Sequence, residues 1–192
     1  MRAVTVVGAV MLLTATSTAQ AGLIGKELTV DYFLPSLGTT YPLSDASPQT
    51  FTVGPGVETV VTIENILSIA VDFDDDSVSF YFDKLDAYFS QWNSAAFNGL
   101  VFTLVGPGPL GISAFEVTPG LYMPGFDASR ITVTTNSIAF NWQGLRYDPD
   151  SPDNSGDGIA VSARLVPEPG ILVLLGGGLL TLGATMRRRR SC

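Results

Sequence analysis

The sequence contains no histidine, a single cysteine and few basic residues. The absence of histidine excludes Ser-His-Asp and Cys-His catalysis, histidine acid–base chemistry and histidine-ligated metals. The one cysteine is Cys192, so the rest of the chain depends on packing rather than on disulfides. Only 10 Lys and Arg stand against 18 Asp and Glu, a net charge of −8, which disfavours binding to nucleic-acid phosphates. We therefore expect no nucleic-acid partner and no cofactor, and much of the usual enzyme repertoire is excluded.

The charges are unevenly distributed along the chain. Half of the basic residues lie at the two ends, and these are Arg2, Arg187, Arg188, Arg189 and Arg190. Residues 22–165 hold five basic side chains against 17 acidic ones, a net charge of −12. The chain therefore divides into two terminal segments and one acidic central domain, which is long enough for a single buried core.

Residues 1–21 have the pattern of a secretory signal peptide. Arg2 provides a positive start, Ala3 to Leu13 form an apolar run, and small and polar residues follow. Ala19 and Ala21 complete the small-x-small pattern that signal peptidase accepts. We therefore expect signal peptidase to cleave the chain before Gly22.

Residues 166–190 combine three features in a fixed order. Val166-Pro167-Glu168-Pro169 comes first, the apolar stretch Ile171 to Met186 follows, and the four arginines 187–190 come last. As a helix, the apolar stretch spans roughly 24 Å, at the margin of a hydrocarbon core of about 30 Å. The arginines predict a cytoplasmic C-terminus by the positive-inside rule. We expect a transmembrane helix over residues 171–186, and a plain single-span anchor is the alternative to a processed tail.

This three-part tail resembles the PEP-CTERM sorting signal. In that family the tail is recognised by exosortase, an integral-membrane cysteine transpeptidase of Gram-negative bacteria that make extracellular polysaccharide. The resemblance implies that Pro167, Glu168 and Pro169 are the recognition motif. It implies that the cytoplasmic stop consists of Arg187, Arg188, Arg189 and Arg190. It also implies export through the inner membrane, transient anchoring there, and release to the cell surface or the extracellular matrix. The resemblance covers only the tail and implies nothing about the fold of residues 22–165.

Alternating apolar and polar residues predict an all-β central domain. One hairpin is expected from Val71 through a turn at Asp74 to Ser77 and on to Phe82, and a second from Ile131 through Asn136 to Trp142. Further strands are expected at residues 28–33, 49–53, 58–63, 100–105, 112–117 and 158–166. Pro-Gly clusters separate them. This spacing favours an antiparallel β-sandwich, of the jelly-roll or Ig-like kind.

The two hairpins also align without a gap at an offset of 60 residues. Shared positions include Ser77 with Ser137, Phe80 with Phe140, and Leu85 with Leu145. Either an internal duplication or the convergence of two amphipathic hairpins on the same pattern would explain the alignment.

Oxygen ligands and aromatic side chains are the chemistry that remains. Asp153, Ser155 and Asp157 imitate the start of an EF-hand loop, but Arg164 stands where the bidentate acid belongs, so they are weak Ca²⁺ candidates and no metal site is predicted. A polar turn is the favoured interpretation there, as it is for the acidic residues 72–76. Carboxylate-based glycoside hydrolysis would need a pair among Glu27, Glu58, Glu64 and Glu116, which are isolated in the sequence.

The segment 88–97 is rich in aromatic residues, which carbohydrate-binding modules use as stacking platforms. Large aromatic side chains are more often buried, and we expect Trp92 and Trp142 in the core. The sequence therefore favours an exported, non-catalytic component of the extracellular matrix or biofilm. A module that binds extracellular polysaccharide or adheres through Ca²⁺ is the alternative, and a glycoside hydrolase is a weaker one.

Overall fold

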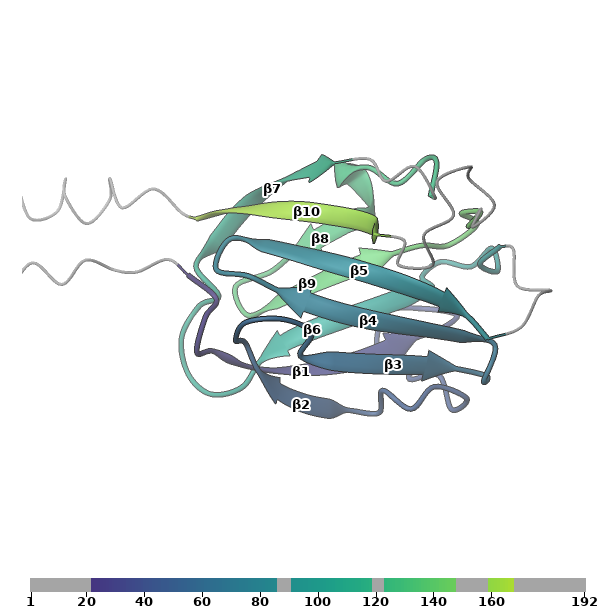
Figure 1. Cartoon of the computed structure of the whole chain (residues 1–192), viewed down its shortest axis with the longest axis horizontal. Helices are drawn as coiled ribbons and strands as arrows, with labels where there is room; N and C mark the ends of the chain where they lie inside the picture. The colour runs from purple at the N-terminus through teal and green to yellow at the C-terminus, as the bar shows by residue number, and fades with distance from the viewer. Residues whose placement is uncertain (1–21, 86–90, 119–122, 148–158, 168–192) are drawn as a thin grey trace, which may run out of the picture.

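The computed structural model describes residues 22–85, 91–118, 123–147 and 159–167. They form two antiparallel β-sheets of five strands each, shown in Figure 1. The first sheet has the order β2-β1-β6-β9-β8, and the second has the order β3-β4-β5-β10-β7. Helix among the described residues is limited to the 3-10 turn Ala128–Arg130 before β8. The all-β, antiparallel prediction is therefore confirmed.

The strand bounds agree closely with the expected ranges. The first sheet contains β1 (Glu27–Phe33), β2 (Gln49–Thr52), β6 (Gly99–Leu104), β8 (Ile131–Val133) and β9 (Ser137–Asn141). The second sheet contains β3 (Thr59–Ile63), β4 (Leu67–Phe73), β5 (Ser77–Lys84), β7 (Ile112–Thr118) and β10 (Ile159–Pro167).

Both expected hairpins form, one in each sheet. In the β4–β5 hairpin Val71 is opposite Phe80, and the Asp74 amide donates to the carbonyl of Ser77 at 2.9 Å across the turn. In the β8–β9 hairpin Ile131 is opposite Phe140. Because side chains alternate along a strand, this register places the valine, isoleucine and phenylalanine side chains of each pair on the same face.

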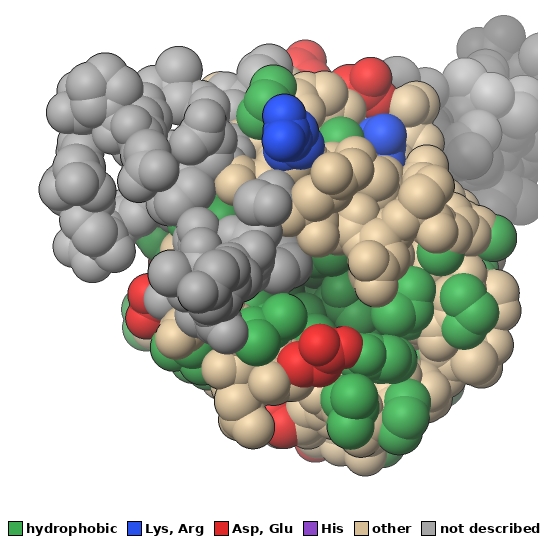
Figure 2. Space-filling model, turned by 90° about the vertical axis from the view of Figure 1, so that its right-hand side faces the viewer, with side chains coloured by type: hydrophobic (Ala, Val, Ile, Leu, Met, Phe, Trp, Pro, Cys, Tyr) green, Lys and Arg blue, Asp and Glu red, His purple; other side chains and the backbone are tan. Residues whose placement is uncertain are grey.

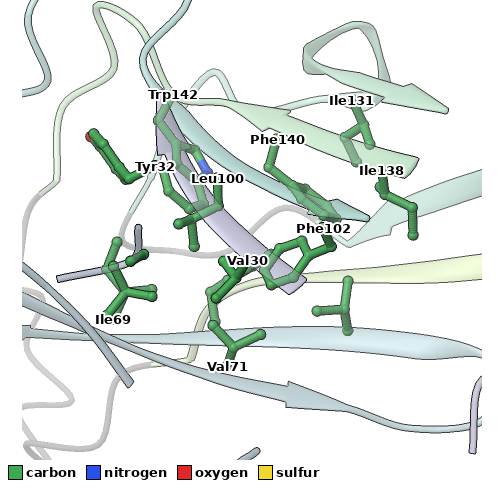
Figure 3. Packing of buried hydrophobic residues seen from close by; sticks show 14 of the residues in the cluster. Val30, Tyr32, Ile69, Val71, Leu100, Phe102, Ile131, Ile138, Phe140 and Trp142 are labelled. Carbon is green, nitrogen blue, oxygen red and sulfur yellow. The ribbon is translucent and has the colours of Figure 1, made fainter. Parts of the chain in front are cut away.

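The apolar faces of the two sheets share one core. Phe73 of the second sheet contacts Phe102 of the first, with ring centroids 4.9 Å apart and planes at 81°. Figure 3 shows Phe102 and Phe140 directed toward the side of the core where Val71 and Ile69 lie. Trp142 is fully buried and Trp92 is 2% exposed, so both tryptophans belong to the core as expected.

A second, smaller cluster covers part of the outer face of the first sheet. Val101 and Ala139 project away from the main core and pack with Phe97 from the segment before β6. Ala139 alternates with Ile138 and Phe140 in the sequence, and this alternation predicts that it lies on the polar face of the hairpin. The structure buries it because Phe97, distant in sequence, folds back over this part of the sheet.

Strand order depends on contacts between residues far apart in the sequence. β10 pairs with β5 on one side and with β7 on the other, and β1 pairs with both β2 and β6. β10 therefore lies inside the second sheet. Its described backbone reaches Pro167, which is paired with Ile112 beyond a register shift.

Candidate functional site

An open pocket lies at one end of the two sheets, where the loop between β1 and β2 meets the turn between β3 and β4. It has a volume of about 640 Å³. Its lining residues are Pro42, Leu43, Ser44, Asp45, Thr62, Glu64 and Asn65. Figure 2 views this end of the molecule and shows hydrophobic side chains around a hollow, with acidic side chains among them.

The local sequence explains how the pocket forms. Glu64 and Asn65 have φ values of 52° and 56°, and the Ile66 amide donates to the carbonyl of Ile63 at 2.9 Å. Two left-handed residues in succession are typical of a type I′ hairpin turn, which Asn favours. Asn65 between the alternating runs of β3 and β4 is the signal in the sequence that indicates this turn.

The loop between β1 and β2 extends the edge of the second sheet. The Glu64 amide donates to the Leu43 carbonyl at 2.8 Å, and the Asp45 amide donates to the Thr62 carbonyl at 3.1 Å. An isolated bridge joins Ser44 to Ile63 between them. The pocket wall is thus held to β3 by backbone hydrogen bonds, which satisfy part of the edge of this strand.

The two carboxylates of the pocket already accept hydrogen bonds from this chain. Asp45 Oδ1 accepts from the Thr62 amide at 2.7 Å, and Glu64 Oε1 accepts from the hydroxyl of Tyr41. Both side chains are exposed. With the remaining lone pairs, carboxylates can accept hydrogen bonds from the hydroxyl groups of a polar ligand, beside the exposed apolar surface of Leu43.

A second group of carboxylates lies at the tip of the β4–β5 hairpin and beside it. Burial raises the pKa of Asp72, and the charge of Asp74 adds to this effect. Burial also raises the pKa of Glu58, against two hydrogen bonds that its carboxylate accepts, from the Gly54 amide at 3.0 Å and the Phe73 amide at 2.7 Å. Glu58 therefore holds the chain before β3 against the end of β4.

The other glutamates are separated from one another. Glu27 begins β1, Glu64 lies in the turn after β3, and Glu116 lies in β7. Within the described ranges, no group of three or more acidic or other metal-binding side chains is placed to hold a metal ion. The weak Ca²⁺ candidates Asp153, Ser155 and Asp157 lie outside these ranges.

The aromatic segment does not supply a stacking surface where it is described. Trp92 is 2% exposed and Phe97 is 7% exposed. The exposed large apolar side chains in the described parts of the chain are all aliphatic: Ile24, Leu37, Leu43, Val57, Val60, Leu85 and Val105.

The predicted targeting residues lie mostly beyond the described ranges. Those outside them are Ala19 and Ala21 of the signal site, Glu168 and Pro169 of the sorting motif, and the predicted cytoplasmic stop of Arg187, Arg188, Arg189 and Arg190. The expected membrane segment 171–186 also lies outside, and the described part contains no helix with the length and apolarity needed to cross a membrane. Pro167 is the one residue of the predicted motif whose backbone is described, as the last residue of β10.

Comparison with known proteins found no match to this chain among family models, curated proteins or solved structures.

Proposed function

We propose that this chain is an exported protein of the PEP-CTERM class, sorted by exosortase to the cell surface or the polysaccharide matrix, where it serves as a non-catalytic structural component. The observation that carries the proposal is the order of the terminal features. Arg2, an apolar run and a small-x-small site stand at the start of the chain, and Pro167-Glu168-Pro169, an apolar stretch and four arginines stand at its end.

The placement of the chain ends in the fold agrees with this proposal. The segment that leads into β1 and the end of β10 lie at the same end of the two sheets (Figure 1). A domain exported by an N-terminal signal and held by a C-terminal span has both connections directed toward one membrane. The loop between β1 and β2 and the β3–β4 turn, whose residues line the pocket, lie at the opposite end, which would then be turned away from the membrane (Figure 1).

The packing and hydrogen bonding of the described side chains support a structural role. We propose that the two sheets form a β-sandwich of the jelly-roll or Ig-like kind, since Phe73, Phe80, Phe102 and Phe140 join them through one aromatic core. Glu58 is engaged with backbone amides. This organisation suits a domain whose stability comes from packing in an oxidising compartment without disulfides.

The test is the fate of the full chain in a Gram-negative host with and without exosortase. We expect intact mass to show loss of residues 1–21 in both strains and loss of the tail only where exosortase is present. The variants Glu168→Ala and Pro169→Ala should keep the tail, whereas Pro107→Ala and Pro109→Ala, in another Pro-x-Pro segment, should be processed normally. An intact tail in the strain with exosortase would overturn the proposal.

The pocket supports a second candidate function, the binding of extracellular polysaccharide. Asp45, Glu64 and Asn65 present oxygen and amide groups beside Leu43, a combination that suits sugar hydroxyls and an apolar sugar face. We expect the variant Asp45→Asn to weaken retention of the processed protein on the host's own polysaccharide. Asp83→Asn, an exposed charge outside the pocket, is the matched control. Equal retention of both variants and the parent chain would rule this function out at the pocket.

A Ca²⁺-dependent adhesive role is tested separately, because its candidate residues Asp153, Ser155 and Asp157 lie outside the described ranges. Calorimetry and thermal melting of the processed chain with Ca²⁺ measure it directly. No heat of binding and no shift in melting temperature would exclude it.

A further inference from the structure

The first described residue lies against the tip of the β4–β5 hairpin. Gly22 is buried, the Leu23 amide donates to the Asp75 carbonyl at 3.0 Å, and the Ile24 amide donates to Asp75 Oδ1 at 3.4 Å. A Cβ atom added to Gly22 would lie 1.8 Å from Asp75 Oδ1. The nitrogen of Gly22 is two bonds from this added Cβ atom and so lies about 2.5 Å from it. The nitrogen is therefore within about 4.5 Å of the Asp75 carboxylate.

This hairpin tip carries an excess of negative charge. Asp74, Asp75 and Asp76 follow one another, and Asp72 and Glu58 lie on the adjoining segments. Lys26 is the basic side chain of the segment that leads into β1. Burial lowers the pKa of Lys26, and the charge of Asp75 opposes this effect. The Nζ atom of Lys26 is engaged elsewhere, where it donates to the Leu110 carbonyl at 2.5 Å.

We propose that signal-peptide cleavage before Gly22 completes the fold, because the new α-ammonium group of Gly22 forms an ion pair with Asp75. The inference rests on the proposed export function, which supplies the cleavage. In the hydrolysis, the bond between the Ala21 carbonyl carbon and the Gly22 nitrogen breaks, the carbon takes the hydroxyl of water, and the nitrogen takes its proton. At neutral pH the free amine then takes up the proton that the new Ala21 carboxyl group releases. An amide nitrogen, which carries no charge in the uncut chain, thus becomes a cation beside the acidic tip.

The consequence is a difference between the uncut and the cut protein. In the cut chain the pair would fasten the start of the domain to the turn between β4 and β5, at the end of the sheets where β10 also ends (Figure 1). The residue at this position is glycine, and any larger side chain would meet the Asp75 carboxylate. Export would therefore yield a domain more stable than its precursor.

The test compares thermal melting of the secreted, processed chain with that of the uncut full chain. The processed chain and its Asp75→Asn variant are measured at pH 6.5 and at pH 10. An unperturbed α-amino group has a pKa of about 7.7 to 8.0, and the ion pair raises that value in the folded state. The stabilisation by the ion pair is therefore fully present below the pKa that the α-amino group has in the unfolded state. It is lost as the pH rises through the higher pKa that this group has in the folded state.

At pH 6.5 we expect the processed chain to melt about 2–4 °C above its Asp75→Asn variant, with the difference lost at pH 10. For the uncut chain, the difference in melting temperature from its own Asp75→Asn variant should not change between the two pH values. Asp74→Asn is the matched control, because it removes one negative charge from the same tip but leaves Asp75 in place. The difference in melting temperature between the processed chain and Asp74→Asn should be the same at pH 6.5 and at pH 10.

N-terminal sequencing of the processed chain separates the failure of the export proposal from the failure of the ion pair. A chain that keeps residues 1–21 in a secreting host would overturn the export proposal itself. A chain that begins at Gly22, but whose Asp75→Asn and Asp74→Asn variants behave alike at both pH values, would overturn the ion pair alone.

Discussion

The rings of Phe80 and Phe140 meet edge to face in the centre of the core, with centroids 4.8 Å apart and planes at 70°. They occupy equivalent positions in the two hairpins that align at an offset of 60 residues. The next equivalent pair, Phe82 and Trp142, has centroids 5.4 Å apart and planes at 82°. The two similar hairpins therefore face each other from opposite sheets and contact through corresponding residues.

This contact predicts an energetic coupling between the two sheets. The single variants Phe80→Leu and Phe140→Leu should each destabilise the domain, because each leaves unfilled space in a close-packed core. The double variant should cost about 0.5–1.5 kcal/mol less than the sum of the two single variants, since the edge-to-face attraction is lost only once.

Urea unfolding of all four chains measures the coupling. Leu37→Ala, at a position 58% exposed, is the control and should change the free energy of unfolding by less than about 0.5 kcal/mol. Strictly additive effects of the two phenylalanine variants would contradict the coupling.

Gly99 allows two strands of the first sheet to approach closely. A Cβ atom added there would lie 1.9 Å from the carbonyl oxygen of Phe140, which is backbone and cannot rotate away. We predict that Gly99→Ala lowers the free energy of unfolding by about 2–3 kcal/mol, because the ladder between β6 and β9 must shift. Gly54→Ala is the matched control, since nothing lies within 4 Å of the added atom. Equal stability of the two variants in urea unfolding would disprove the steric account.

Asn98 is a buried hub of hydrogen bonds before β6. The side-chain Oδ1 of Asn98 accepts from the hydroxyl of Tyr32 at 2.5 Å, and its side-chain Nδ2 donates to the Asn93 carbonyl at 3.2 Å. The backbone amide of Asn98 donates to Asn141 Oδ1 at 3.0 Å. We expect Asn98→Ala to destabilise the domain by about 1–3 kcal/mol, because it leaves the Tyr32 hydroxyl buried without this acceptor.

Tyr32→Phe removes the donor instead and should cost only about 1 kcal/mol. Combined with Asn98→Ala it should restore part of the loss, since the hydroxyl group that Asn98→Ala leaves without its acceptor is then absent. Thermal or urea unfolding of the three variants measures this, and an undiminished loss in the double variant would argue against the hydrogen bond as the cause.

The raised pKa of Glu58 predicts that mild acidification stabilises the domain. Burial raises its folded pKa above the ordinary value of 4.5, so the folded state binds a proton more readily than the unfolded state does. Stability should therefore increase as the pH falls from 7 through the raised value, and this contribution should level off below about 4.5. Asp72 has a pKa shifted in the same direction and adds to the trend.

The measurement is the midpoint of urea unfolding between pH 7 and pH 4.5 for the parent chain and for Glu58→Gln. The variant keeps one acceptor for a backbone amide but cannot titrate, so its pH dependence should be shallower. Asp83→Asn, at an exposed position, should keep the slope of the parent chain. A parent chain that loses stability steadily over this range would contradict the prediction.

The strands could be predicted from the sequence because the alternation of apolar and polar residues is a local property. Val71 and Phe73 before the turn, and Val78 and Phe80 after it, specify a hairpin without reference to the rest of the chain. The burial of Trp92 and Trp142 could also be predicted, because large aromatic side chains are removed from water wherever a core can accept them. The terminal segments are also read locally, from the order of charge, apolar run and small or Pro-rich motif.

The order of the strands and the contacts between loops could not be predicted in this way, because they depend on residues far apart in the chain. The insertion of β10 between β5 and β7 pairs Ala163 with Val78 and with Val117, and no local pattern encodes so distant a choice. The cover of Ala139 by Phe97, the approach of Gly99 to Phe140 and the contact of Gly22 with Asp75 have the same origin. Each depends on the packing of two complete sheets, where burying the most apolar surface selects among many locally acceptable pairings.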